Sequence, residues 1–327
     1  MESRRQNKPL ASISLDLDNQ WTYMKIHGDD GWELYPSYLD IFVPHVLDVL
    51  DELELKITFF IVGKDTERLE NRAFLKMISD RGHEVGNHSY NHESWLQTYS
   101  YEKIEKEIRE AEEAIESVTG QRTRGFRGPG FSWSKDLLKV LENRGYQFDA
   151  STLPTYLGPI ARMYYFSKSD LSKEDKKARK ELFGKFSEGF RRLKPYYWNL
   201  GESKKLLEIP VTTMPVFKIP FHLSYLLFIS GFSLLAMKAY LNFSLFLCKL
   251  TRTSPSMLLH PLDIIGGDKV PQLAFFPGMN LQTNKKVEVF KYVLKRINKE
   301  FEIVPMLRYA DLYSKEKINI KVVQLKK

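Results

Sequence analysis

The chain has 327 residues, 43% of them hydrophobic, so it is long enough for one large domain or two ordinary ones with a packed core. Its single cysteine, Cys248, excludes an internal disulfide, and its first residues are polar without an apolar signal-peptide core, so we expect a cytoplasmic protein. The formal charge of +8 favours anionic surroundings, but the lack of a Cys/His finger, heptads or an aromatic and basic RNA-binding pattern argues against nucleic acid.

Strands and helices alternate over the first half of the chain. The expected strands are apolar and rich in β-branched or aromatic residues, and they lie at 10–17, 56–62, 83–86, 124–127 and 146–150. Amphipathic or charged helices separate them, at 38–53, 71–81, 101–118 and 135–143. Strands separated by helices predict a parallel sheet, and this many repeats predict an α/β barrel rather than a small open sheet.

The alternation breaks after residue 157 and returns only near the end of the chain. We therefore expect a single domain over 1–327 with an insertion at about 157–250, comprising a charged helix at 167–193 and an apolar segment at 219–250. A short strand at 207–211 restores the strand pattern. The barrel then continues with a strand at 256–260, which ends at His260, a closing helix at 285–300 and a short strand at 302–305.

The apolar segment leaves three possibilities open. Its first part, 219–237, has no formal charge and is about as long as a bilayer crossing of roughly 20 residues. Pro220 and several serines dilute its apolar character, and Lys218 and Lys238 bracket it. It is a helix that is buried or lines a groove, a helix lying on a membrane surface, or a membrane span.

Candidate site residues come where several expected strands end. Asp16 and Asp18 close the first strand, His88 and His92 follow the third, and His260 ends a late one. Period two places the two aspartates on the same side of their strand, and the carboxyl ends of parallel strands meet at one rim of a barrel. Two imidazoles and a carboxylate are the protein ligands of many hydrolytic zinc centres. The pattern therefore predicts a site for one divalent metal ion, zinc, at this rim.

The motifs resemble, in chain order, those of the polysaccharide deacetylases, carbohydrate esterase family four. They are Asp16-Leu17-Asp18, His88-Ser89-Tyr90-Asn91-His92, Phe126-Arg127-Gly128-Pro129-Gly130, Phe148-Asp149 and Leu259-His260-Pro261. The paired histidines and the His-Pro pair are the specific parts of the resemblance. It implies a distorted (β/α) barrel of about seven units and a metal-dependent hydrolase that removes acetyl groups from N-acetylated sugars.

The resemblance also implies a role for each matching residue. The metal ligands would be Asp18, His88 and His92. Asp16 would be the general base and His260 the general acid that protonates the leaving amine, which is a poor leaving group unless protonated. Arg127 would hold Asp16 by a charge-assisted pair, and Asp149 would orient either His260 or Arg127. Zinc would lower the pKa of a bound water towards about 7, so that a nearby carboxylate can take its remaining proton.

The sequence departs from the family pattern beside the first motif. Many members have adjacent aspartates followed by glycine, whereas here Leu17 separates the pair and Asn19 follows it. The insertion and the apolar segment are closer to an intracellular or lipid-associated branch than to secreted chitin or peptidoglycan deacetylases. The basic charge and the apolar segment fit a glycolipid or lipid-linked sugar, deacetylated or deformylated by a protein peripheral to the inner membrane face.

Two other functions remain open at this stage. A cyclic-amide hydrolase would keep the same barrel and site but act on a different substrate. A catalytically silent glycan- or lipid-binding module would use the apolar segment as its functional part, although the presence of every expected polar group argues against it. The sequence does not indicate an oligomeric state.

Overall fold

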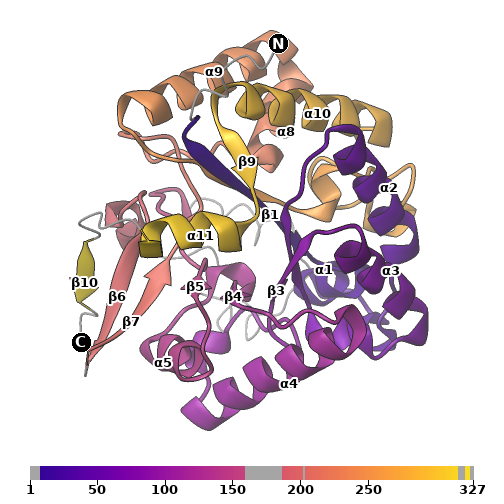
Figure 1. The fold of residues 1–327 in the computed structure, drawn as a ribbon. Coiled ribbons are helices and arrows are strands. Elements are labelled where there is room, and N and C mark those ends of the chain that lie inside the picture. Colours follow the sequence, from indigo (N-terminus) through magenta and orange to yellow (C-terminus); the bar gives the residue numbers. More distant parts are fainter. Residues whose placement is uncertain (1–7, 159–185, 202, 316–320, 325–327) are drawn as a thin grey trace, which may run out of the picture.

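The computed structural model describes residues 8–158, 186–201, 203–315 and 321–324 (Figure 1). Its strands are β1 (Leu10–Leu17), β2 (Thr58–Ile61), β3 (Glu84–Asn87), β4 (Gly125–Phe126), β5 (Phe148–Asp149), β6 (Tyr196–Gly201), β7 (Lys204–Glu208), β8 (Ser256–Leu259), β9 (Glu302–Val304) and β10 (Val322–Gln324). Its helices are α1 (Gln20–His27), α2 (Leu39–Glu52), α3 (Leu69–Asp80), α4 (Tyr101–Thr119), α5 (Lys135–Asn143), α8 (Leu223–Phe232), α9 (Leu234–Leu250), α10 (Thr283–Glu300) and α11 (Met306–Lys315).

Seven of the described strands form the wall of a barrel. Neighbouring strands run parallel in the order β8, β1, β2, β3, β4, β5, β7. The wall is joined by the stretch after β7, where Val211 N donates to Thr152 O and Thr212 N donates to Ser256 O, at 2.9 and 2.8 Å. The fold is therefore an α/β barrel, as predicted, with the insertion between β5 and β8.

Side chains of β1 alternate between the barrel interior and the surrounding helices. Ile13, Leu15 and Leu17 belong to the core cluster shared with the outer helices, while Ser14 and Asp16 point the other way. A second cluster, which includes residues of β2, β5 and β7, fills the interior together with α11, and Figure 1 shows α11 lying across the strands. The backbone nitrogens of Met306 and Leu307 accordingly donate to Thr58 and Glu84, at the starts of β2 and β3, so α11 closes the amino-terminal end of the barrel.

Local signals explain where the helices begin and end. Ser100 accepts a hydrogen bond from Lys103 N at the start of α4, and Gly120 ends the same helix in the left-handed conformation. Ser134 caps α5 in the same way, and both helices lie where the sequence predicted them. Amphipathic spacing then packs their apolar faces on the sheet.

The structure corrects the expected insertion. Residues 167–185 of the predicted charged helix lie outside the described part of the chain, and the remainder forms a single 3-10 turn at Phe186–Phe190. The sequence interpretation also missed β6, which pairs antiparallel to β7 and extends the sheet, with β10 beyond it. The apolar segment is not one helix, because Ser233 ends α8 and its side chain caps α9. Among the described helices, none combines the length and the apolar character that a membrane crossing requires.

Candidate metal centre and active site

The site residues predicted from the strand ends meet in one cavity. Asp16 lies in β1 and Asp18 follows it directly, His88 follows β3, and His260 follows β8. Together with His92 they line a cavity of about 650 Å³. The parallel strands bring residues from opposite ends of the sequence to the same rim.

Asp18, His88 and His92 point their ligand atoms at one another. One ligand atom from each side chain lies within 4.8 Å of the other two. The Nε2 atoms of His92 and His88 lie 2.9 and 3.4 Å from Oδ1 of Asp18. All three residues are buried, and this Oδ1 has no hydrogen-bond partner among the described residues. A buried carboxylate oxygen that faces two imidazole nitrogens without a donor fits the predicted divalent metal ion.

The protonation states of the three side chains suit metal binding. Nδ1 of His88 donates to the carbonyl oxygen of Arg127 at 2.7 Å, so the lone pair of this ring is on Nε2. Burial lowers the pKa of His92, which favours a neutral ring. Burial raises the pKa of Asp18, but His92 and His88 lower it more, so the carboxylate is ionised. Burial lowers the pKa of His88, but Asp16 and Asp18 raise it overall.

A buried glutamate fixes the loop that carries both histidines. Glu107 on α4 accepts hydrogen bonds from the backbone nitrogens of Tyr90 and Asn91, at 3.2 and 3.0 Å. Ser89 and His92 adopt positive φ angles of 62° and 53° in this loop. The two rings therefore meet because the loop bends back on itself, and not because the residues share a helix face.

Arg127 holds Asp16 from inside the barrel. Its Nη1 donates to Oδ1 of Asp16 at 3.1 Å, and its Nε donates to the carbonyl oxygen of Ala150 at 3.0 Å. The guanidinium is fully buried and lies over the ring of Phe60, 4.8 Å from its centroid. A charge-assisted pair in such low-dielectric surroundings is strong and directional. The carboxylate of Asp16 therefore faces the cavity from a fixed position.

The partner of His260 is Asp263, three residues further along the chain. Oδ2 of Asp263 lies 3.7 Å from Nδ1 of His260 and accepts a hydrogen bond from the His260 backbone nitrogen at 2.9 Å. Burial lowers the pKa of His260, but Asp263, Asp16 and Asp18 raise it to about 9. Burial and the charge on His260 lower the pKa of neighbouring His222 to about 4. At neutral pH, His260 is therefore protonated and His222 is neutral.

Asp149 was expected to orient His260 or Arg127, but it supports the site less directly. Its carboxylate accepts hydrogen bonds from the Ser151 hydroxyl, at 2.6 Å, and from the backbone nitrogens of Ala150 and Ser151, and it shares a hydrogen bond with Glu208. The Ser151 oxygen in turn accepts from the backbone nitrogen of Gly128 at 2.8 Å, next to Arg127. Burial and the charge on Asp149 raise the pKa of Glu208, so the glutamate carries the proton of the pair. Asp149 thus acts on the backbone beside Arg127 and makes no contact with His260.

Residues 25–148 match the sequence model of the polysaccharide deacetylase family. Over these residues the chain is similar to members of that family. The matched range includes both loop histidines and Arg127, and leaves out Asp16, Asp18 and His260. Recognition of the family from the sequence motifs is confirmed.

Several curated members of the polysaccharide deacetylase family are similar to part of the chain. A peptidoglycan-N-acetylglucosamine deacetylase of Bacillus cereus is 30% identical over 144 residues, which cover 44% of this chain and 63% of that protein. A peptidoglycan deacetylase-like protein of Gibberella zeae is 31% identical over 174 residues, covering 50% of this chain and 48% of that protein. A chitooligosaccharide deacetylase of Sinorhizobium fredii is 36% identical over 109 residues, covering 32% and 48%. The chain thus spans less than two thirds of each relative.

A solved structure has the same fold. A Mycobacterium smegmatis protein classed with the polysaccharide deacetylases superposes with a TM-score of 0.58 at 16% identity, covering 99% of this chain and 97% of that one. The alignment includes the insertion, which the family model leaves out. The distorted α/β barrel predicted from the polysaccharide deacetylase motifs is therefore present.

Sequence reasoning missed three acidic residues that organise this site. Asp263 follows the His-Pro pair and caps the turn after it, and its spacing of three from His260 is a readable capping signal. Glu208 is a fully buried acid within an apolar strand, which is also a signal. Glu107 lies on a helix rich in exposed glutamates, and nothing in the sequence distinguishes it from them.

Proposed function

We propose that the protein is a metal-dependent hydrolase that removes an N-acyl group, acetyl or formyl, from an N-acylated sugar. The observation that carries the proposal is the buried Asp18, His88 and His92 cluster, which shares one cavity with Asp16 and His260. The relatives support it, because their names describe deacetylation of peptidoglycan and chitooligosaccharides. The site would combine a metal ion, a general base and a general acid, which are the three groups that hydrolysis of an amide requires.

Asp18, His88 and His92 would hold the metal ion, and we propose zinc. Such an ion polarises the amide carbonyl and makes water acidic enough to attack at neutral pH. Ligands of one carboxylate and two imidazoles leave coordination positions for water and substrate. One carboxylate and two imidazoles suit zinc. By the Irving–Williams order, the same ligands also bind other divalent transition-metal ions.

The other polar side chains move protons. Asp16, held by Arg127, would take a proton from the attacking water as its oxygen bonds to the acyl carbon. His260 would then give its ring proton to the sugar nitrogen as the carbon–nitrogen bond breaks. The products are a carboxylic acid and a sugar amine, and later proton exchange with water returns Asp16 to its ionised form and His260 to its protonated form.

The finer substrate assignment also belongs to this proposal. We propose that the acylated sugar is part of a glycolipid or a lipid-linked precursor, processed at the cytoplasmic face of a membrane. The cavity supports it, because apolar and aromatic side chains, including Tyr225 and Phe276, line it beside the polar centre. No described feature favours a cyclic amide as the substrate.

The first experiment measures acetate released from N-acetylated chitooligosaccharides by the purified protein. We expect activity with about one metal ion bound per chain, loss of activity after treatment with a chelator, and recovery when zinc is added back. Formylated sugars and a cyclic amide are assayed in parallel. Activity that survives complete metal removal, or that appears only on the cyclic amide, would contradict the proposed function.

The pH profile of deacetylation is expected to depend on Asp263. Because the pKa of His260 is raised to about 9, its acid form persists through neutral pH and is lost as pH rises through that value. Asp263→Asn keeps an oxygen for the His260 backbone nitrogen but removes the charge that raises this pKa. The alkaline limb of kcat should therefore move to lower pH. An unchanged alkaline limb in the variant would show that Asp263 does not set the protonation of His260.

A further inference from the structure

The helices α8 and α9 present large apolar side chains to solvent. Phe232 is 80% exposed and Leu235 is 78% exposed at the corner between the two helices, and Leu250 is 68% exposed at the far end of α9. All residues from Gly231 to Ala236 are exposed. Isolated exposed leucines are common on soluble proteins, but a continuous set of this kind marks a surface that contacts something apolar.

Five of the exposed apolar residues of α9 form a stripe along one side of the helix. They are Leu235, Ala239, Phe243, Phe246 and Leu250. Steps of three and four residues place them on one face, whereas Met237, Leu241 and Cys248 pack into the core on another. The helix has 17 residues and is therefore about 25 Å long. We call the stripe together with Phe228 and Phe232 the apolar face.

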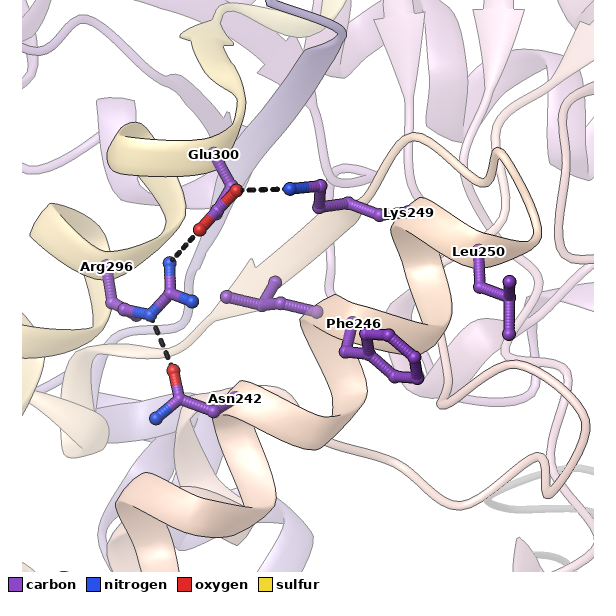
Figure 2. A pocket seen from close by; sticks show the side chains of 7 residues that line it. Asn242, Phe246, Lys249, Leu250, Arg296 and Glu300 are labelled. Carbon is purple, nitrogen blue, oxygen red and sulfur yellow. Dashed lines mark hydrogen bonds and ion pairs between the residues drawn. The ribbon is translucent and has the colours of Figure 1, made fainter.

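The side of α9 that contacts α10 is polar, so the apolar stripe does not pack against α10. Figure 2 shows Asn242 and Lys249 reaching towards Arg296 and Glu300 of α10, with Phe246 and Leu250 pointing away from this network. Arg296 donates to Asn242 at 2.5 Å, and Lys249 pairs with Glu300 at 2.7 Å. The polar contacts fix α9 against the barrel and leave its apolar side chains outward.

The charge of this region favours an anionic partner. Between Glu208 and Asp263 the sequence contains no Asp or Glu, and its charged residues are Lys218, Lys238, Lys249 and Arg252. A helical pair with an exposed apolar face and only basic charges is typical of segments that lie in the interface of an anionic bilayer. If the apolar face bound a second protein instead, the absence of Asp and Glu from this segment would have no explanation.

The apolar face begins at the mouth of the cavity. Phe228, Gly231 and Phe232 of α8 line the same cavity as His260 and the metal ligands. The rings of Phe228 and Phe232 lie 5.1 Å apart, and Phe228 is itself 68% exposed. A surface bound along α9 would therefore lie next to the cavity mouth and not on the opposite side of the molecule.

We propose that the apolar face docks the protein on an anionic phospholipid bilayer, with the cavity mouth opening at the membrane surface. Phe232, Leu235 and the α9 stripe would enter the headgroup and acyl boundary to a depth of about 5–10 Å, while Lys238 and Arg252 contact anionic headgroups. The benefit of this orientation rests on the proposed function: an acylated sugar on a lipid carrier would reach His260 while its lipid stays in the membrane.

The test is binding to vesicles, which needs no substrate. Wild-type protein should sediment with vesicles of phosphatidylcholine and phosphatidylglycerol, and more weakly with phosphatidylcholine alone or at high salt. The triple variant Leu235→Ser, Phe246→Ser and Leu250→Ser should partition at least about tenfold more weakly. None of these three side chains lines the catalytic cavity, so hydrolysis of a soluble N-acetylated sugar should be unchanged.

Leu69→Ser is the matched control, because Leu69 on α3 is 72% exposed and outside the apolar face. It should bind vesicles like the wild type. Failure of the wild type to bind anionic vesicles, or equal binding by the triple variant, would overturn docking even if deacetylation is intact. A wild-type dimer that the triple substitution converts to a monomer, without vesicle binding, would assign the face to a second copy and also overturn the proposal. Loss of deacetylation with vesicle binding retained would contradict only the proposed function.

Discussion

Replacing Asp16 with Asn is expected to lower kcat for deacetylation by about 10²–10⁴-fold. The amide has the shape of the carboxylate but cannot accept the proton that the attacking water must lose. Asp16 is not one of the clustered metal ligands, so the variant should still bind about one metal ion per chain. Rates under saturating substrate and metal content by elemental analysis measure the two effects separately.

The substitution also leaves Arg127 without its ionic partner. Removing one member of a buried ion pair destabilises the folded protein by about 3–5 kcal/mol, because the remaining charge is uncompensated. Thermal unfolding must therefore accompany the kinetics, and assays belong well below the midpoint of the variant. Asp80→Asn, which alters an exposed pair with Lys76, serves as the control. Full activity in folded, metal-loaded Asp16→Asn protein would refute the base assignment.

Replacing His260 with Ala is expected to lower kcat on N-acetylated sugars by about 10²–10⁴-fold with little change in KM. Departure of the sugar amine requires a proton, and His260 lines the cavity with its pKa raised to about 9. An acetyl ester of a phenol needs no such proton, because a phenolate is a good leaving group. The variant should therefore retain most of its activity on the ester.

The ratio of amide to ester rates distinguishes an acid from a structural residue. If His260 only supported the turn after β8, its loss would lower both rates together. His45→Ala on α2, outside the residues that line the cavity, is the control and should leave the ratio unchanged. Equal losses on both substrates would contradict the general-acid assignment.

Much of the site followed from the sequence because strand ends determine it. Once 10–17 was recognised as a strand of a parallel barrel, period two placed Asp16 and Asp18 on its inner side, and the same rule brought His260 to the same rim. The pairing of Arg127 with Asp16 needed only the family motif. These features depend on local patterns and on one rule about parallel strands.

The remaining features depend on contacts between distant residues. The spacing of His88 and His92 is that of a helix face, yet the rings meet in a loop that Glu107 holds from another helix. Asp149 was expected beside Arg127 or His260, but Ser151 and Glu208 take its hydrogen bonds, and Glu208 comes from a strand 59 positions later. No pattern within a short window of sequence reports such partners.

The ring of strands is joined at one place by few bonds, between the stretch after β7 and Ser256 at the start of β8. The α8 and α9 hairpin is inserted at this seam, whereas the candidate metal ligands are Asp18, which directly follows β1, and the two histidines in the loop after β3. Sequence at the seam can lengthen, shorten or change character without moving a ligand. The proposed docking surface and the candidate metal ligands thus lie in separate stretches of sequence, so selection can change one stretch while preserving the other.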